Sequence, residues 1–134
     1  MASIRNHTST DVTKLLLVGD SGSGKTATLA TLANAGYNLR ILDFDDGLAI
    51  LPEFLLDSAV DRVSFVTLKD PIGKADAFRK SANLIGNWKD GDEDFGPVNK
   101  WTSKDVLVID SLTLMGEAAL RGALSFNNKK PPDQ

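Results

Sequence analysis

The stretch Gly19-Asp20-Ser21-Gly22-Ser23-Gly24-Lys25-Thr26 decides the fold expected of this 134-residue chain. It fits the pattern G-x-x-x-x-G-K-[ST] at every fixed position. Glycines let backbone N–H groups close around phosphate oxygens, and a helix that follows presents the positive end of its dipole to the same anion. The stretch therefore predicts a phosphate-binding loop between a strand and a helix. Lys25 would contact the β- and γ-phosphates of a nucleotide, and the Thr26 hydroxyl would ligate Mg²⁺.

The flanking sequence has the periodicity that such a loop needs. Residues 14–18 (KLLLV) form a short apolar run that stops at Gly19, which predicts a strand buried on both faces. Residues 26–35 read as a helix that ends at Gly36. The residues expected to bind nucleotide are Gly19, Asp20, Ser21, Gly22, Ser23, Gly24, Lys25, Thr26 and Ala27.

The rest of the chain alternates between strand and helix patterns. Apolar or β-rich runs predict strands at 39–43, 62–68 and 105–110. Helical patterns cover 47–56, with a bend near Pro52, a segment from Pro71 to Ile85, and 112–126; residues 89–103 are turn-rich and form the longest connection. This order predicts an α/β fold: a mostly parallel sheet covered by helices on both sides, which binds ligands at the carboxyl ends of its strands.

Carboxylates follow two of these strands. Asp110 ends the apolar run Val106-Leu107-Val108-Ile109, where a carboxylate beside a phosphate-binding loop would hold Mg²⁺ through its water shell. Asp43 ends the strand at 39–43, Asp45 and Asp46 follow it, and one of the three would face the γ-phosphate and activate water. The competing interpretation is an acidic turn closed by Gly47, and the sequence leaves open which of the three acts.

Composition sets the broad class. The chain is 42% hydrophobic and 25% charged, which is typical of a globular protein of one domain. A net charge of -3 argues against a surface devoted to nucleic acid, and the absence of cysteine excludes disulfides and thiolate metal sites. No apolar run approaches the length of a membrane span, and residues 1–13 lack the apolar stretch of a signal peptide. We therefore expect a soluble cytoplasmic protein: a flexible arm at 1–13, a domain at 14–126 and a polar tail at 127–134. His7 lies in the arm and is assigned no chemistry.

Taken together, three segments resemble the RecA-like P-loop ATPases, and more narrowly the small phage-encoded members associated with single-strand annealing and recombination. They are LLLVGDSGSGKT at 15–26, ILDFDDGLAIL at 41–51 and VLVIDSLT at 106–113. The resemblance implies a three-layer α/β/α fold, ATP and Mg²⁺ as cofactors, and Lys25, Asp45 and Asp110 as catalytic residues, with Thr26 and Asp110 at the metal. Asp45 matches the family's water-activating carboxylate, which is often Glu, and Ser111 matches a serine of the family.

The resemblance also implies single-stranded DNA as a partner, a homo-oligomer, no membrane, and the host cytoplasm if the gene is a phage gene. RecA-like cores continue beyond the helix that follows Asp110, whereas this chain stops after it, so the sequence favours a fragment of a longer protein. A four-stranded sheet would leave an edge uncovered.

Several alternatives remain at this point. Asp70-Pro71-Ile72-Gly73 fits the D-x-x-G pattern of a GTPase, but Asn99-Lys100-Trp101-Thr102 lacks the carboxylate of N-K-x-D. A small-molecule kinase would need an Arg-rich lid, and none is evident. A nucleotide-binding assembly module without turnover also fits. Trp88, Phe95 and Trp101 could stack on bases or anchor the long connection to the body of the domain.

Overall fold

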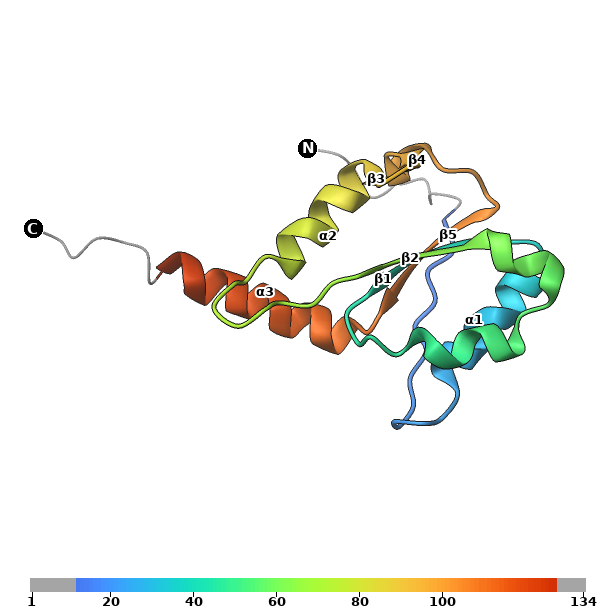
Figure 1. Cartoon of the computed structure of the whole chain (residues 1–134), viewed down its shortest axis with the longest axis horizontal. Helices are drawn as coiled ribbons and strands as arrows, with labels where there is room; N and C mark the ends of the chain where they lie inside the picture. The colour runs from blue at the N-terminus through green and yellow to red at the C-terminus, as the bar shows by residue number, and fades with distance from the viewer. Residues whose placement is uncertain (1–11, 128–134) are drawn as a thin grey trace, which may run out of the picture.

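A three-stranded parallel sheet forms the centre of the computed structural model, which describes residues 12–127 (Figure 1). Strand β1 (Asn38–Asp43) lies in the middle, between β2 (Val63–Thr67) and β5 (Asp105–Asp110). Ile41 pairs with Phe65 on one side and with Val108 on the other. Residues 39–43 are all buried, as expected for the middle strand of a parallel sheet.

Helices cover both faces of this sheet. Figure 1 shows α1 (Lys25–Asn34) with the 3₁₀ helices η2 (Leu48–Phe54) and η3 (Asp57–Arg62) on one side, and α2 (Ala77–Gly86) with α3 (Leu112–Asn127) on the other. Leu39 and Ile41 pack against the α1 side, while Leu42 packs against the α2 and α3 side. This alternation follows from the two-residue period of a strand. The predicted α/β fold, with a parallel sheet between helical layers, is confirmed.

The prediction of a first strand at 14–18 is wrong. Within the described residues this segment pairs with no strand, and its side chains face outward: Leu15, Leu16 and Val18 are 75%, 69% and 85% exposed. An apolar run does not specify which strand it will pair with or in which register. A β-strand is stable only where a neighbouring strand supplies its backbone hydrogen bonds. The sheet therefore contains three of the four predicted strands, and β5 forms one of its edges.

The predicted helix from Pro71 starts later, at Ala77. Ile72, which falls inside the predicted helix, precedes the observed one and is fully exposed at 106%. The Asp70 carboxylate explains this start, because its Oδ1 accepts the backbone N–H groups of Asp76 (2.7 Å) and Ala77 (2.8 Å) and so caps the helix there. Gly73, at φ 78°, turns the preceding chain into a loop.

The turn-rich connection at 89–103 contains structure that the sequence analysis missed. Strands β3 (Trp88–Asp90) and β4 (Glu93–Gly96) form an antiparallel hairpin, followed by the 3₁₀ helix η4 (Val98–Lys100). Trp88 is completely buried and its ring lies 5.8 Å from that of Trp101, whose Nε1–H donates to the Phe95 carbonyl at 2.9 Å. The three aromatic residues therefore anchor the connection to the domain.

A buried arginine joins the hairpin to the sheet. Arg40 is 8% exposed, and its guanidinium lies 3.7 Å from the centre of the Phe95 ring. It also donates to the Ser64 hydroxyl at 3.2 Å, and that hydroxyl donates in turn to Glu93 at 2.7 Å. These contacts fix the hairpin over the face of β1 and β2.

Two further expectations concern segments that are mostly outside the described residues. The arm at 1–13, including His7, and the tail at 127–134 fall largely in this category. No helix in the described part of the chain is long and apolar enough to cross a membrane.

The burial difference between the two apolar segments predicts unequal effects of truncation. Ile41→Ala removes a fully buried side chain of β1 and should cost about 2–5 kcal/mol of unfolding free energy. Leu16→Ala acts on a side chain that is 69% exposed and should cost less than about 0.5 kcal/mol. Urea denaturation of both variants measures the difference, and similar losses would contradict the exposed placement of 14–18.

Candidate functional site

A cavity of about 470 Å³ opens at the carboxyl ends of β1 and β5, where parallel sheets of this kind bind ligands. The glycine-rich loop and the first residues of α1 form one wall. The turn after β1 and the start of α3 form the other. The lining residues are Gly19, Ser21, Gly22, Gly24, Lys25, Thr26, Ala27, Asp45, Gly47, Ile50, Asp110, Ser111 and Thr113.

The loop adopts a backbone that only glycine takes easily at two positions. Gly22 has φ 77° and Gly24 has φ 87°, in the left-handed region that costs other residues free energy. Gly24 also occupies the N-cap position of α1, so the loop leads directly into the helix. The first N–H groups of a helix lack partners within it, and here they belong to residues that line the cavity.

Lys25 lies against the inside of this loop. Its ammonium donates to the carbonyl oxygens of Gly19 at 2.6 Å and Asp20 at 2.7 Å. The Ser23 hydroxyl oxygen lies further from the Lys25 ammonium, at 3.5 Å. The positive charge of Lys25 is therefore held at the N-terminus of α1, beside the cavity.

One hydrogen bond joins the helix after the loop to the end of β5. The Thr26 hydroxyl donates to Asp110 Oδ2 at 3.0 Å, across 84 residues of sequence. A hydroxyl that donates its proton to a carboxylate keeps both lone pairs for another partner. The pair thus presents oxygen atoms of the kind that Mg²⁺ prefers.

The surroundings of Asp110 disfavour its negative charge. Burial raises the pKa of this carboxyl above its usual value, and the nearby Asp45 and Asp43 raise it further. The hydrogen bond from Thr26 and the charge of Lys25 act in the opposite direction without cancelling the increase. A cation placed between these carboxylates would relieve the repulsion.

Asp43, which ends β1, and Asp45 and Asp46, which follow it, take different positions in what we call the acidic turn, residues 43–47. Asp43 is 1% exposed and lies outside the cavity lining. The side chain of Asp46 forms an ion pair with Lys69 at 2.5 Å. Only Asp45 lines the cavity, so the structure separates the three residues that the sequence could not.

Most of the predicted nucleotide-binding residues line the cavity, and two of them do not. Asp20 contributes its carbonyl to Lys25 instead, and Ser23 places its hydroxyl near the same ammonium. The sequence did not predict three further lining residues, which are Gly47, Ile50 and Thr113. For Ile50 and Thr113 no local pattern signals the role, which comes from the folding of η2 and α3 against the loop.

The GTPase patterns fall elsewhere in the structure. Asp70 caps α2, and neither it nor Gly73 lines the cavity. Asn99 and Lys100 lie in η4, which precedes the amino end of β5, whereas the cavity is at the carboxyl end of that strand. The geometry therefore gives these two patterns no part in the site.

No family model, curated protein or solved structure matches this chain. The chemistry of the cavity is therefore the basis for a proposed function. Among residues 12–127 no three His, Cys, Asp or Glu side chains are grouped so as to hold a metal ion by themselves. A metal bound beside Thr26 and Asp110 would take its other ligands from water and from a bound anion.

The raised pKa of Asp110 makes a prediction about stability and pH. Because the folded state disfavours the ionised carboxyl, the wild type loses stability as pH rises through the carboxyl's titration range. Asp110→Asn keeps an oxygen to accept from Thr26 and carries no charge. We expect its thermal midpoint to exceed that of the wild type at pH 7, and the difference to shrink as pH approaches the usual carboxyl value of 3.8.

Calorimetric scans over this pH range check the prediction. Asp92→Asn, at the exposed tip of the β3–β4 hairpin, removes the same charge away from the cavity and serves as the control. A lower midpoint for Asp110→Asn than for the wild type at pH 7 would show that the carboxylate stabilises the fold.

Proposed function

We propose that this chain is a RecA-like P-loop domain that binds Mg-ATP and hydrolyses it. The observation that carries the proposal is the 3.0 Å hydrogen bond between Thr26 and Asp110, in a cavity that the glycine-rich loop and Asp45 also line. A mobile Gly/Ser connection has no need of a strand-end carboxylate against the first turn of the next helix. A phosphate-binding loop needs it there to hold a metal beside the phosphates.

Phosphate binding is the task of the loop and of Lys25. Backbone N–H groups of residues 22–26 and the dipole of α1 would bind the phosphate oxygens. The Lys25 ammonium would exchange the carbonyl oxygens of Gly19 and Asp20 for the β- and γ-phosphates. A hydrogen bond from an ammonium to an anionic phosphate oxygen is stronger than one to a neutral carbonyl oxygen, and this difference favours the exchange.

The residues present fit a magnesium ion as well. Thr26 Oγ1 would ligate it directly, and Asp110 would hold it through its water shell, with phosphate oxygens completing the shell. When bound, Mg²⁺ neutralises charge on the phosphates as the terminal phosphoryl group leaves. Relief of the repulsion at Asp110 adds to the binding free energy.

Asp45 is the residue proposed to orient and activate water. Water attacks the γ-phosphorus as the bond to the bridging β–γ oxygen breaks, ADP leaves, and the water's proton passes through Asp45 to the released phosphate or to solvent. RecA-like ATPases often have Glu at the position that matches Asp45. Because the Asp side chain is one methylene shorter, we expect slow turnover in the 134-residue chain.

The proposed process is recombination or annealing of single-stranded DNA. The likeness of the three motifs to those of RecA-like ATPases supports this part of the proposal.

The first prediction of this proposal concerns affinity. Lys25→Ala should weaken Mg-ATP binding by tenfold or more, since a charge-assisted contact with phosphate contributes about 1.5–3 kcal/mol. Isothermal titration calorimetry measures the affinity, with Lys80→Ala on the exposed surface of α2 as the matched control. Equal Mg-ATP affinities for the Lys25 and Lys80 variants would contradict the proposal that the glycine-rich loop binds the phosphates.

The second prediction separates binding from turnover. Asp45→Asn should leave the affinity for Mg-ATP nearly unchanged and lower the hydrolysis rate by about 10²–10³-fold, the range expected of a general base. Asp110→Asn should weaken Mg²⁺-dependent binding as well, because its role is at the metal. Release of phosphate under single-turnover conditions measures the rate. An Asp45→Asn variant as active as Asp92→Asn would assign water activation to another group.

A further inference from the structure

Asp43 is a buried carboxylate whose two oxygens both accept hydrogen bonds. Oδ1 accepts the backbone N–H of Asp46 at 2.7 Å, and Oδ2 accepts the Thr67 hydroxyl at 3.2 Å. Its backbone carbonyl accepts the N–H of Leu68 at 2.8 Å. The residue therefore joins the acidic turn, at the end of β1, to the end of β2.

These bonds fix a backbone shape that Asp46 would otherwise adopt at a cost. Asp46 has φ 56°, in the left-handed region that residues other than glycine seldom enter. The bond from its N–H to Asp43 closes the turn around this residue. The ion pair between the Asp46 carboxylate and Lys69 is exposed and adds little to that restraint.

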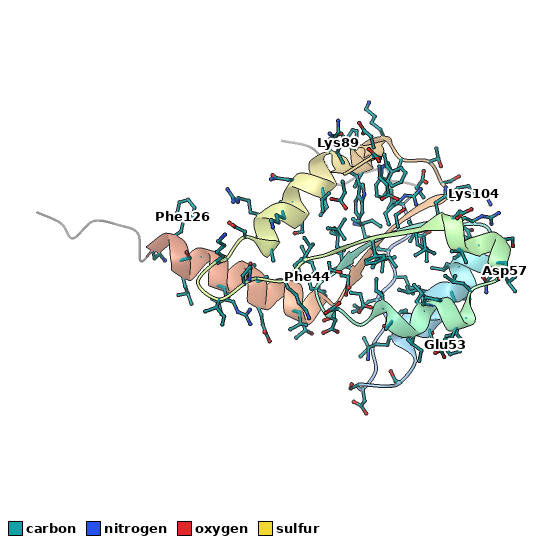
Figure 2. The ribbon with its side chains drawn as sticks, in the orientation of Figure 1. Phe44, Glu53, Asp57, Lys89, Lys104 and Phe126 are labelled. Atoms are coloured by element: carbon teal, nitrogen blue, oxygen red, sulfur yellow. The ribbon has the colours of Figure 1, made fainter. Side chains whose placement is uncertain are left out.

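The neighbour on the other side of Asp45 is fixed as well. Phe44 is 5% exposed and packs in the core with Leu68 and Ala118; Figure 2 labels it where the sheet meets α3. The N–H groups of Phe44 and Asp45 point to the Asp110 carbonyl, at 2.6 Å and 3.3 Å. Asp45 is thus the one residue of 43–46 whose side chain lines the cavity, and it is held at both ends.

We propose that Asp43 is a positioning residue: its carboxylate holds the acidic turn so that Asp45 faces the phosphate site, and it takes no proton itself. The inference rests on the proposed function, because it assigns a task to a neighbour of the proposed water-activating residue. Its physical basis is the two-acceptor geometry of the side chain, which alanine lacks and which the oxygen of asparagine supplies in part. The Thr67 hydroxyl can rotate to accept from the amide of an asparagine.

The test compares Asp43→Ala, Asp43→Asn, Asp45→Asn and the double variant Asp43→Ala/Asp45→Asn in the full chain. Single-turnover hydrolysis and Mg-ATP affinity are measured for each. Asp43→Ala should lose about 10²-fold in rate, as expected of a displaced reacting group, with affinity within about threefold of wild type. Asp43→Asn should retain most of the rate. The double variant should be no slower than Asp45→Asn, because the two residues act as one unit.

Asp105→Ala is the matched control. Asp105 is a half-buried carboxylate at the opposite end of the sheet that accepts from the Asn38 amide at 3.0 Å and from the Thr102 N–H at 2.9 Å. Its loss should destabilise the fold and leave the rate per folded molecule unchanged. If Asp43→Ala does not fold, Thr67→Val removes one of the two hydrogen bonds and should slow hydrolysis about fivefold at unchanged affinity.

Hydrogen exchange of the Asp46 amide gives a readout that does not depend on hydrolysis. The exchange should accelerate at least tenfold in Asp43→Ala, or in Thr67→Val by a smaller factor, and should not change in Asp105→Ala. A wild type that binds or hydrolyses no ATP would overturn the proposed function, while the exchange rate would still decide whether Asp43 holds the turn.

Four results would overturn the inference. They are unchanged exchange at Asp46 in Asp43→Ala, equal losses of rate in Asp43→Asn and Asp43→Ala, losses of rate and affinity in the same proportion, and additive effects in the double variant. The second result would mean that the charge of Asp43 takes part in the reaction. The third and fourth would mean that Asp43 supports the fold without positioning Asp45.

Discussion

The hydrogen bond from the Thr26 hydroxyl to Asp110 is the contact on which the candidate site depends. It fixes the start of α1 against the end of β5, and through α1 it fixes the glycine-rich loop. The same strand end receives the acidic turn, because the Asp110 carbonyl accepts the N–H groups of Phe44 and Asp45. Asp110 thus joins the glycine-rich wall of the cavity to the wall that carries Asp45. The folded state disfavours the charge of this carboxyl group, because burial and the neighbouring Asp45 and Asp43 raise its pKa.

Local sequence patterns predicted which residues come together at the cavity better than they predicted the elements around it. Gly19, Gly24, Lys25 and Thr26 are the fixed positions of the glycine-rich pattern, and all four line the same cavity as Asp110 at the end of β5. The choice between Asp43, Asp45 and Asp46 depended on the register of β1 and on the partners in β2. A run of LDFDD does not encode either of these, so the sequence could not separate the three residues.

The wrong predictions of secondary structure have a common physical origin. Residues 14–18 have strand composition, but pairing is a property of two segments, and the structure leaves these apolar side chains exposed. Helix α2 starts later than predicted because the Asp70 carboxylate accepts the backbone N–H of Asp76, six residues further along the chain. The hairpin at 88–96 is held by Trp88, Trp101 and the contact between Arg40 and Phe95, which are tertiary interactions. Periodicity reports which faces of a segment are apolar, and it does not report what those faces will contact.

A ¹⁵N–¹H NMR titration of the chain with a non-hydrolysable analogue of ATP, with and without Mg²⁺, decides whether this cavity binds a magnesium–nucleotide complex. We expect saturable shifts at residues 19–27, 45–47 and 110–113, with those at Thr26 and Ser111 appearing only when Mg²⁺ is present. Shifts that do not saturate, or that map to α2 and the hairpin instead, would contradict the assignment of this cavity as a magnesium–nucleotide site.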